Sequence, residues 1–208
     1  MLPLYKKHGF IALFYLFLLA GCSSHSLKHT PTDTNYKHVN ELKNWHIKGK
    51  LAFKSPQDKF SANLNWVYQD KNYQLKLLTF LGTSIFTLES QSESKHKPFK
   101  LDVEGEQYFS DNVDELIWSI TGRHLPISDL PTLIKGDVAI KNKTSKQYII
   151  ERNELGQLNK LTFTDNNGRV WQIHYLTYAK TNGLLLPTNI KLRSSDISVK
   201  IAISEWII

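Results

Sequence analysis

The sequence predicts a mainly β protein (α+β) that consists of one antiparallel sheet of ten strands and a short helical insertion. Three observations predict it. Apolar and polar residues alternate with a period of two in ten segments, as in strands with one buried face. Most links between neighbouring segments have hairpin length, which favours antiparallel pairing, and so long a twisted sheet tends to curl or close. Between the fifth and sixth segments the apolar period becomes helical.

Residues 1–21 have the pattern of a secretory signal peptide. Lys6 and Lys7 precede an apolar run over 9–20, which is shorter than the roughly 20 residues of a bilayer span. Leu19-Ala20-Gly21-Cys22 resembles the bacterial lipobox, in which cleavage precedes a cysteine that then receives lipid. The alternative is an ordinary signal or anchor with a stray cysteine. We favour the lipobox, because the single cysteine stands where cleavage is expected, and we expect a covalent diacylglycerol and an N-acyl chain on Cys22.

The segment 22–34 is expected to be a flexible, lipidated tether, because it is polar and has no periodicity. Ser23 resembles an outer-membrane address, since lipoproteins with Asp at this position tend to stay on the inner membrane. A single folded domain, 35–208, follows. Loss of Lys6 and Lys7 lowers the formal charge from +7 to about +5, and no Lys/Arg run or motif indicates a nucleic-acid partner.

The first half of the domain is expected to contain a short helix and five strands. The helix, over 35–44, rests on a weak three-residue spacing of apolar positions. The strands follow from alternation, with Trp45, Ile47, Leu51 and Phe53 on one face of the first. They are expected over 45–54, 59–68, 73–77, 85–88 and 99–103.

The helical insertion is expected to contain two helices that lie on the sheet. Val113, Leu116, Ile117 and Ile120 fall at i, i+3, i+4 and i+7, with Asp111 as the candidate N-cap and Gly122 at the C-terminus. A second helix is expected over 128–135, before Gly136. The insertion would either plug the core or form a lid over a concave face. Amphipathic helices usually complete cores, so the pattern by itself favours the plug.

Five more strands are expected in the second half of the domain. Asn167-Gly168 lies between two of them and is a strong type I′ hairpin signal. The expected ranges are 146–152, 158–165, 169–178, 187–193 and 197–206. With the first five they complete the antiparallel sheet.

The sequence offers no catalytic constellation, and we expect no enzyme, no metal site and no soluble cofactor. The eight histidines are scattered, and none has the H-x-H or HExxH spacing of a metal site. No nucleophile elbow, P-loop or dinucleotide fingerprint occurs. Asp102 and Glu104 could act as an acid and a base, but carboxylates at i and i+2 are commonplace.

The segment 78–84, LTFLGTS, is unusual for a link between two strands. Turns favour polar residues, Gly and Pro, yet Phe80 and Leu81 stand directly before Gly82. One alternative is that the strand continues and buries both side chains. The other is that apolar side chains at the tip of a loop enter a lipid bilayer.

A set of short segments recurs in a characteristic order and spacing: Trp45–Ala52, Ser61–Trp66, Phe80–Gly82, Asp114–Leu116, Gly122, Leu125-Pro126, Leu130, Gly136, Trp171–Tyr175, Leu186-Pro187 and Trp206. Together they resemble the LolB family of outer-membrane lipoprotein receptors, over nearly the whole chain. Phe80-Leu81-Gly82 falls where the family has Pro-Leu-Gly, so the loop is expected to be less rigid. Arg123 or His124 stands where an aromatic is usual, and Leu133 where the second helix usually has Trp.

The resemblance implies an incomplete antiparallel β-barrel of about ten or eleven strands, with a hydrophobic interior covered by a helical lid. It implies a protein, anchored on the periplasmic face of the outer membrane, that accepts acylated lipoproteins from the soluble carrier LolA. It would insert them into the inner leaflet of that membrane. The partners would be LolA, the cargo and outer-membrane phospholipid, and the protein would be a monomer. Leu81 would serve insertion rather than capture.

The apolar strand and helix faces supply candidate residues for the lining of an acyl-chain cavity. Plain core packing is the rival interpretation, since alternation does not distinguish a hollow interior from a filled one. A structural envelope lipoprotein with a packed core is therefore the alternative function, and an envelope esterase is a third. The candidates are Leu51, Phe53, Leu64, Trp66, Leu75, Leu77, Ile85, Leu88, Leu116 and Ile120.

Overall fold

The computed structural model describes residues 38–90, 98–136 and 148–208 and contains one antiparallel sheet of eleven strands. Their order across the sheet is β6-β5-β4-β3-β2-β1-β11-β10-β9-β8-β7, so the sheet is open, with β6 and β7 at its ends. The bounds are β1 (Trp45–Lys54), β2 (Lys59–Gln69), β3 (Asn72–Leu78), β4 (Ser84–Ser90), β5 (Phe99–Val103), β6 (Glu106–Ser110), β7 (Tyr148–Arg152), β8 (Leu158–Thr164), β9 (Val170–Thr181), β10 (Leu184–Arg193) and β11 (Ser198–Ile207). The predicted fold class is confirmed.

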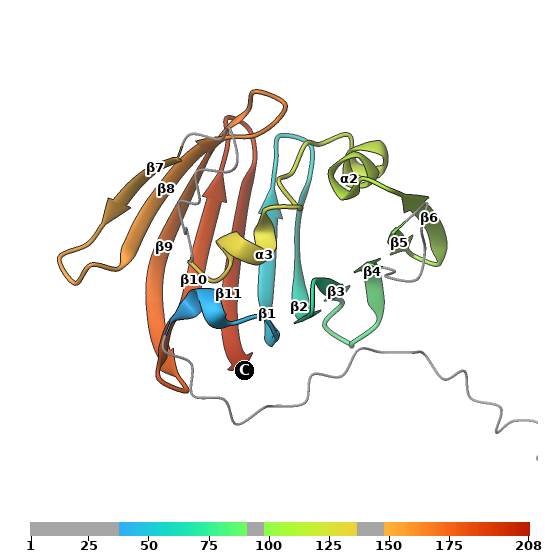
Figure 1. Ribbon diagram of the computed structural model, residues 1–208. Helices are drawn as coiled ribbons and strands as arrows, with labels where there is room; N and C mark the ends of the chain where they lie inside the picture. Colours follow the sequence, from blue (N-terminus) through green and yellow to red (C-terminus); the bar gives the residue numbers. More distant parts are fainter. Residues whose placement is uncertain (1–37, 91–97, 137–147) are drawn as a thin grey trace, which may run out of the picture.

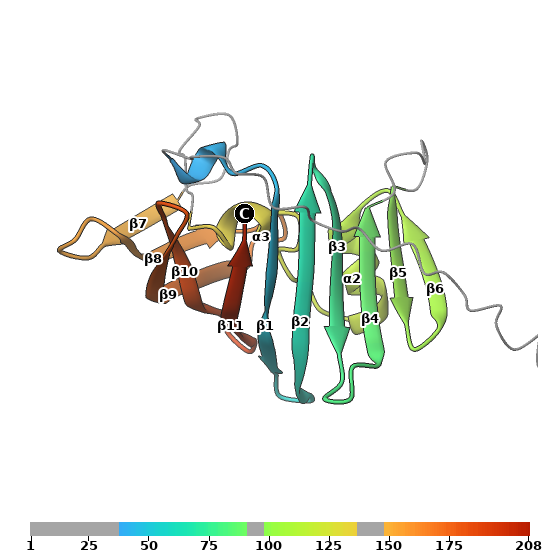
Figure 2. The same ribbon diagram turned by 90° about the horizontal axis from the view of Figure 1, so that it is seen from below.

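The sheet curves around the short helices α2 (Val113–Thr121) and α3 (Leu130–Leu133), which gives the incomplete barrel (Figures 1 and 2). The inward faces of the strands carry the alternating apolar residues, and these form one continuous core with the helices. The predicted signal peptide 1–21 and tether 22–34, with Cys22, lie outside the described residues.

The two halves of the sheet meet where β1 pairs with β11. Ala52 lies opposite Lys200, and the register shifts between Lys48 and Gly49. A Cβ on Gly49 would stand 2.2 Å from the carbonyl oxygen of Ala202, so only glycine permits this approach of the two backbones. The first and the last regular strands of the chain are therefore held side by side.

One strand was missed by the sequence prediction. β6 pairs with β5 through a tight turn in which both Glu104 and Gly105 have positive φ, 53° and 94°. Of its five residues only Tyr108 and Ser110 are even half-buried, because β6 is an edge strand. Its alternation is correspondingly weak, which is why the sequence gives little sign of it. β10 also begins earlier than predicted, at Leu184.

The helices are capped and sized differently from the prediction. Asn112, not Asp111, is the N-cap of α2, and its side-chain oxygen accepts from the backbone N–H groups of Asp114 and Glu115. Gly122 ends the helix at φ 65°, as predicted. α3 is shorter than the predicted 128–135. The predicted helix over 35–44 is a 3-10 turn, η3 (Val39–Glu41), within its described part.

Candidate functional site

A cavity of about 480 Å³ lies between the inner face of the sheet and the helical insertion. This volume is within the roughly 300–1,000 Å³ that is usual for small-molecule pockets. Strands from both halves of the sheet, helix α2 and the segment up to Leu130 contribute to its wall. The lining residues are Leu51, Phe53, Asp58, Lys59, Phe60, Leu75, Leu77, Phe86, Leu88, Ile117, Ile120, Thr121, Arg123, Leu125, Pro126, Ile127, Leu130, Trp171, Leu192, Val199 and Ile201.

Six of the ten residues expected to line a cavity line this one: Leu51, Phe53, Leu75, Leu77, Leu88 and Ile120. The sequence analysis missed the wall formed by the C-terminal strands, which includes Trp171, Leu192 and Ile201. The apolar alternation that could have predicted these residues is present in the sequence, because each occupies an inward position of an alternating strand.

Leu64, Trp66, Ile85 and Leu116 do not line the cavity. Leu64 lies opposite Gly49, and Leu116 is buried between α2 and the core. Phe86, rather than Ile85, lies opposite Leu77 and reaches the cavity. Leu64, Trp66 and Leu116 share a face with lining residues but lie at a different depth. Ile85 is out of step with the lining residues Phe86 and Leu88, because it lies at the register shift between β3 and β4.

The end of the barrel at which β1 begins is filled by aromatic side chains. Trp45 packs edge-to-face on Trp66 and on Trp206, with ring centroids 4.9 and 5.7 Å apart, and it stacks on Tyr68 at 5.2 Å. Trp45 and Trp66 are 0% and 2% exposed. Tyr73 adjoins Trp66 and Tyr68, and burial, followed by the nearby Asp114 carboxylate, raises its pKa. This end of the barrel is therefore closed by packing.

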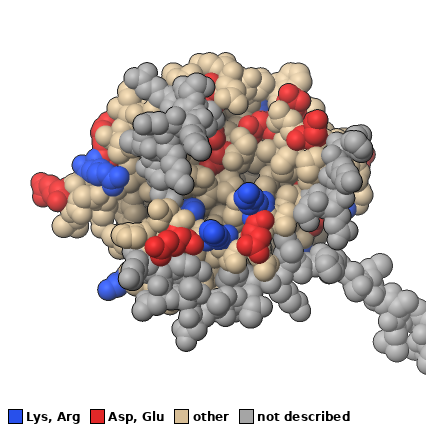
Figure 3. Space-filling model, viewed as in Figure 1, with Lys and Arg blue, Asp and Glu red and all other residues tan. Residues whose placement is uncertain are grey.

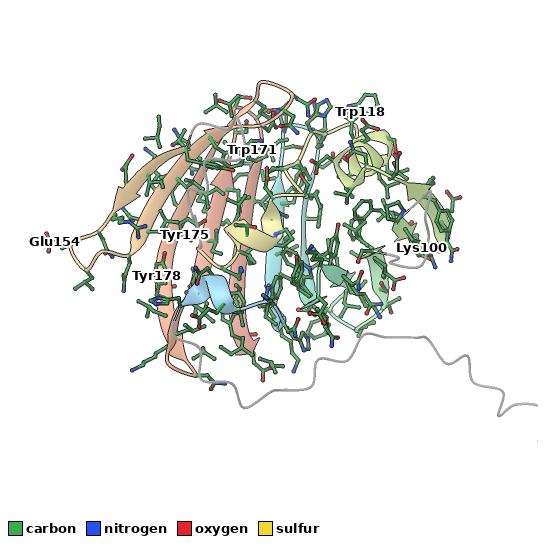
Figure 4. The ribbon with its side chains drawn as sticks, viewed as in Figure 1. Lys100, Trp118, Glu154, Trp171, Tyr175 and Tyr178 are labelled. Carbon is green, nitrogen blue, oxygen red and sulfur yellow. The ribbon has the colours of Figure 1, made fainter. Side chains whose placement is uncertain are left out.

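The helical insertion is fastened to β9, down which Trp171, Tyr175 and Tyr178 follow one another (Figure 4). The Tyr175 hydroxyl donates to the backbone oxygen of Leu133, 2.9 Å away, and the Tyr178 hydroxyl donates to that of Leu158 at 2.6 Å. Burial raises the pKa of Tyr175, and it raises the pKa of Tyr178 to about 12. The α3 region thus plugs the core, whereas α2 roofs the cavity.

The charged and polar lining residues gather at the opposite end, where α2 meets the β1–β2 hairpin. The Arg123 guanidinium donates to Asp58 at 2.7 Å and to Gln57 at 3.1 Å, and it lies 5.8 Å from the ring centre of Phe53. Its side chain is 14% exposed, against 60% for Asp58. Lys59 and Thr121 complete this rim, so the cavity is apolar inside and polar at one mouth.

The loop 79–83 lies at the same end of the strands as this mouth. In an antiparallel meander the β1–β2 and β3–β4 links share an edge, and the β10–β11 link joins them because β11 pairs with β1. We use the name mouth edge for this end of the strands, which carries the links 55–58, 79–83 and 194–197. Thr79 closes the loop by donating to the oxygen of Thr83 at 2.8 Å. Phe80 and Leu81 are 94% and 86% exposed.

In residues 38–90, 98–136 and 148–208, no three or more His, Cys, Asp and Glu side chains are arranged to hold a metal ion. Within the same ranges, no helix combines the length and the apolarity that a bilayer crossing requires.

Comparison with known proteins identifies the family. Residues 43–206 match the family model described as outer membrane lipoprotein LolB. The chain belongs to the LolB family. The outer-membrane lipoprotein LolB of Pseudoalteromonas translucida (strain TAC 125) is 35% identical over 204 residues, which cover 98% of this chain and 95% of the relative. The LolB of Shewanella sp. (strain W3-18-1) is 31% identical over 196 residues, 94% of this chain and 87% of the relative.

The LolB relatives support an outer-membrane location and a part in lipoprotein transport. Among solved structures, a DUF1329 family protein from Desulfovibrio piger is similar with a TM-score of 0.51 at 7% identity, over 81% of this chain and 88% of that protein. At that identity the likeness concerns the fold alone.

Proposed function

We propose that this LolB family member accepts acylated lipoproteins from the carrier LolA and inserts them into the inner leaflet of the outer membrane. The observation that carries the proposal is an apolar cavity whose polar mouth lies on the same edge of the sheet as two fully exposed apolar side chains, Phe80 and Leu81. The cavity would hold the acyl chains, and the loop would contact the bilayer.

The energetics of acyl transfer require such a shelter. Moving an acyl chain of about 15 methylenes from an apolar environment into water costs about 12 kcal/mol of free energy, at ~0.8 kcal/mol per CH₂. No nucleotide-binding motif occurs in the sequence, so transfer runs down a gradient of affinity. The cavity binds the chains more tightly than the carrier does and less tightly than the bilayer does.

We propose that Cys22 carries the diacylglycerol and N-acyl chains that anchor the domain on the periplasmic face. Residues 22–34 then form the tether. More than one acyl chain gives stable anchoring. Ser23, rather than Asp, after the cysteine supports the outer-membrane destination. The domain acts as a monomer and uses no soluble cofactor and no catalytic step.

Saturable binding of a fluorescent fatty acid, displaced by acylated cargo, tests the proposal. Ile120→Glu places a carboxylate in the cavity wall and should weaken binding at least ~10-fold, because an unpaired charge in an apolar site is strongly disfavoured. Ser119→Glu adds the same charge on the exposed face of the same helix and should bind like the wild type. A wild-type protein without saturable binding is a structural lipoprotein with a packed core, the alternative function, and the proposal then fails.

A further inference from the structure

The outer face of the sheet carries basic side chains directly opposite one another on four neighbouring strands. Lys160 of β8 lies opposite His174 of β9, His174 opposite Lys191 of β10, and Lys191 opposite Lys200 of β11. Their neighbours Ile173, Leu192 and Ile201 point into the core, so these four side chains point outward. Arg193, Lys50 and Lys54 extend the row on β10 and β1. We call these seven residues the basic surface.

The acidic residues of this region are already paired. Glu151 accepts from Lys160 at 3.0 Å, and Glu205 accepts from Lys48 at 2.8 Å. Within the described residues, no carboxylate forms an ion pair with Lys191, Arg193 or Lys200. Like charges in directly opposite positions weaken a sheet, so this arrangement does not serve the stability of the fold.

The side chains of the basic surface lie close enough to repel one another. Partial loss of hydration, followed by repulsion from Arg193 and Lys200, lowers the pKa of Lys191. Burial and the neighbouring Lys160, Arg193 and Lys191 lower the pKa of His174, while Glu151 acts in the opposite direction. Loss of hydration is the largest cause in both groups, and the neighbouring positive charges lower both pKa values further.

The other strands of the sheet that the structure describes do not share this character. On the same face of β2, Lys59 lies opposite Lys54, but the outward residues that follow it, Ser61, Asn63 and Asn65, are neutral. On β5 the outward Lys100 and Asp102 have opposite charges, and Lys100 lies opposite Glu89. The face that carries η3 and α3 shows lysine, arginine and acidic side chains interspersed among a majority of neutral ones (Figure 3). The excess is therefore local and is not a general solubilising coat.

We propose that the basic surface docks on anionic phospholipid headgroups. Two arguments favour a bilayer over an acidic protein. The surface is broad, since four strands at ~4.8 Å spacing span about 15 Å, and it is not a single pocket for one side chain. It also reaches the mouth edge, because Arg193 and Lys54 end their strands there. A domain whose Phe80–Leu81 loop enters a bilayer brings these cations to the headgroups. Acyl chains plus a basic patch are a common pair of anchoring signals.

Vesicle binding tests the proposal on the full mature chain, with Cys22→Ala in every variant so that an acyl anchor does not dominate. The test variant is Lys191→Gln/Arg193→Gln/Lys200→Gln. The control, Lys71→Gln/Lys76→Gln/Lys100→Gln, removes three charges from the other half of the sheet. Vesicles contain phosphatidylcholine alone or with 30% phosphatidylglycerol, and bound protein is measured by co-sedimentation.

The test variant should bind the anionic vesicles about 100-fold more weakly than the control at low salt, at roughly five-fold per basic residue. The difference should vanish in 0.5 M NaCl and on phosphatidylcholine alone. Equal binding by the two triple variants overturns the proposal. So does normal vesicle binding with lost affinity for LolA, which would make the surface a protein-docking site.

Fatty-acid binding separates this proposal from the proposed function. The basic surface lies outside the cavity, so the test variant should bind fluorescent fatty acid like the wild type. Failure of the wild type to bind fatty acid removes the transfer function and leaves the vesicle result intact. Circular dichroism of both triple variants confirms that each is folded.

Discussion

Replacement of Leu81 by Glu separates insertion from capture. Leu81 is 86% exposed and is therefore not part of the core, and the loop 79–83 is closed by its own backbone hydrogen bonds. The substitution should leave the free energy of unfolding within about 0.5 kcal/mol of the wild-type value, as is usual for surface sites. The cavity lining does not include Leu81, so acyl-chain binding should also be unchanged.

The size of the effect on the membrane step follows from the exposed side chain. Moving a leucine side chain from water into an apolar phase is worth about 1.5–3 kcal/mol, and nearly all of the Leu81 surface is available for this transfer. At 1.4 kcal/mol for each factor of ten, its loss should slow insertion by roughly 10- to 100-fold. Phe80, which is 94% exposed, remains in Leu81→Glu, so Phe80→Glu/Leu81→Glu should be slower still.

The assay follows a labelled lipoprotein through two steps: from LolA to the acylated protein, and from the protein to liposomes. Leu81→Glu should complete the first step at the wild-type rate and stall at the second. Leu155→Glu is the matched control, because Leu155 is 80% exposed in the β7–β8 link, at the opposite edge of the sheet. Wild-type insertion by Leu81→Glu, or a defect in the first step, would refute the reasoning.

Three further substitutions test the pairing of β1 with β11 and the mouth of the cavity. Gly49→Ala should lower the free energy of unfolding in urea by about 2–4 kcal/mol, because its Cβ meets the backbone of Ala202 and must strain or break the hydrogen bonds between β1 and β11. A loss below ~1 kcal/mol would mean that β1 and β11 separate easily. Arg123→Met removes the link between α2 and Asp58 and should speed the exchange of fluorescent fatty acid several-fold in stopped-flow measurements, with at most ~2 kcal/mol of stability lost. Asp58→Asn should have the same effect, and unchanged exchange in both variants would contradict a closing role for this pair.

Alternation along the chain sufficed to predict ten of the eleven strands, all but the edge strand β6, and it predicted the side of the sheet on which most of their residues lie. It does not say how deep along the barrel a side chain lies. Leu51 and Trp66 both face inward, yet the first lines the cavity and the second is packed against Trp45 at the closed end. The difference depends on which stretch of the sheet the helices cover, and that is a property of the tertiary structure.

Local chemistry limited the prediction in other places. Asp111 and Asn112 are both good N-caps, and the choice of Asn112 depends on where Ser110 ends β6. The rim pair could not be predicted at all, because Arg123 and Asp58 are 65 residues apart in sequence. The sequence did indicate that Arg123 or His124 stands where the LolB family usually has an aromatic residue, and Arg123 forms the rim pair, whereas His124 stacks on Trp118.

The distribution of polarity around the cavity gives the proposed transfer a direction. Asp58, Lys59, Thr121 and Arg123 all lie at the mouth, while the opposite end is sealed by aromatic rings. In the proposed function, acyl chains would therefore lie with their tails inward and the cargo peptide at the rim. Moving each methylene from the cavity into water costs about 0.8 kcal/mol of free energy. Release would therefore be fast only where the acyl chain passes from the cavity directly into the bilayer. The loop 79–83 lies on that same edge. If Leu81 enters the bilayer as proposed, the mouth would face the membrane, and the chains would pass from protein to lipid over the shortest aqueous path.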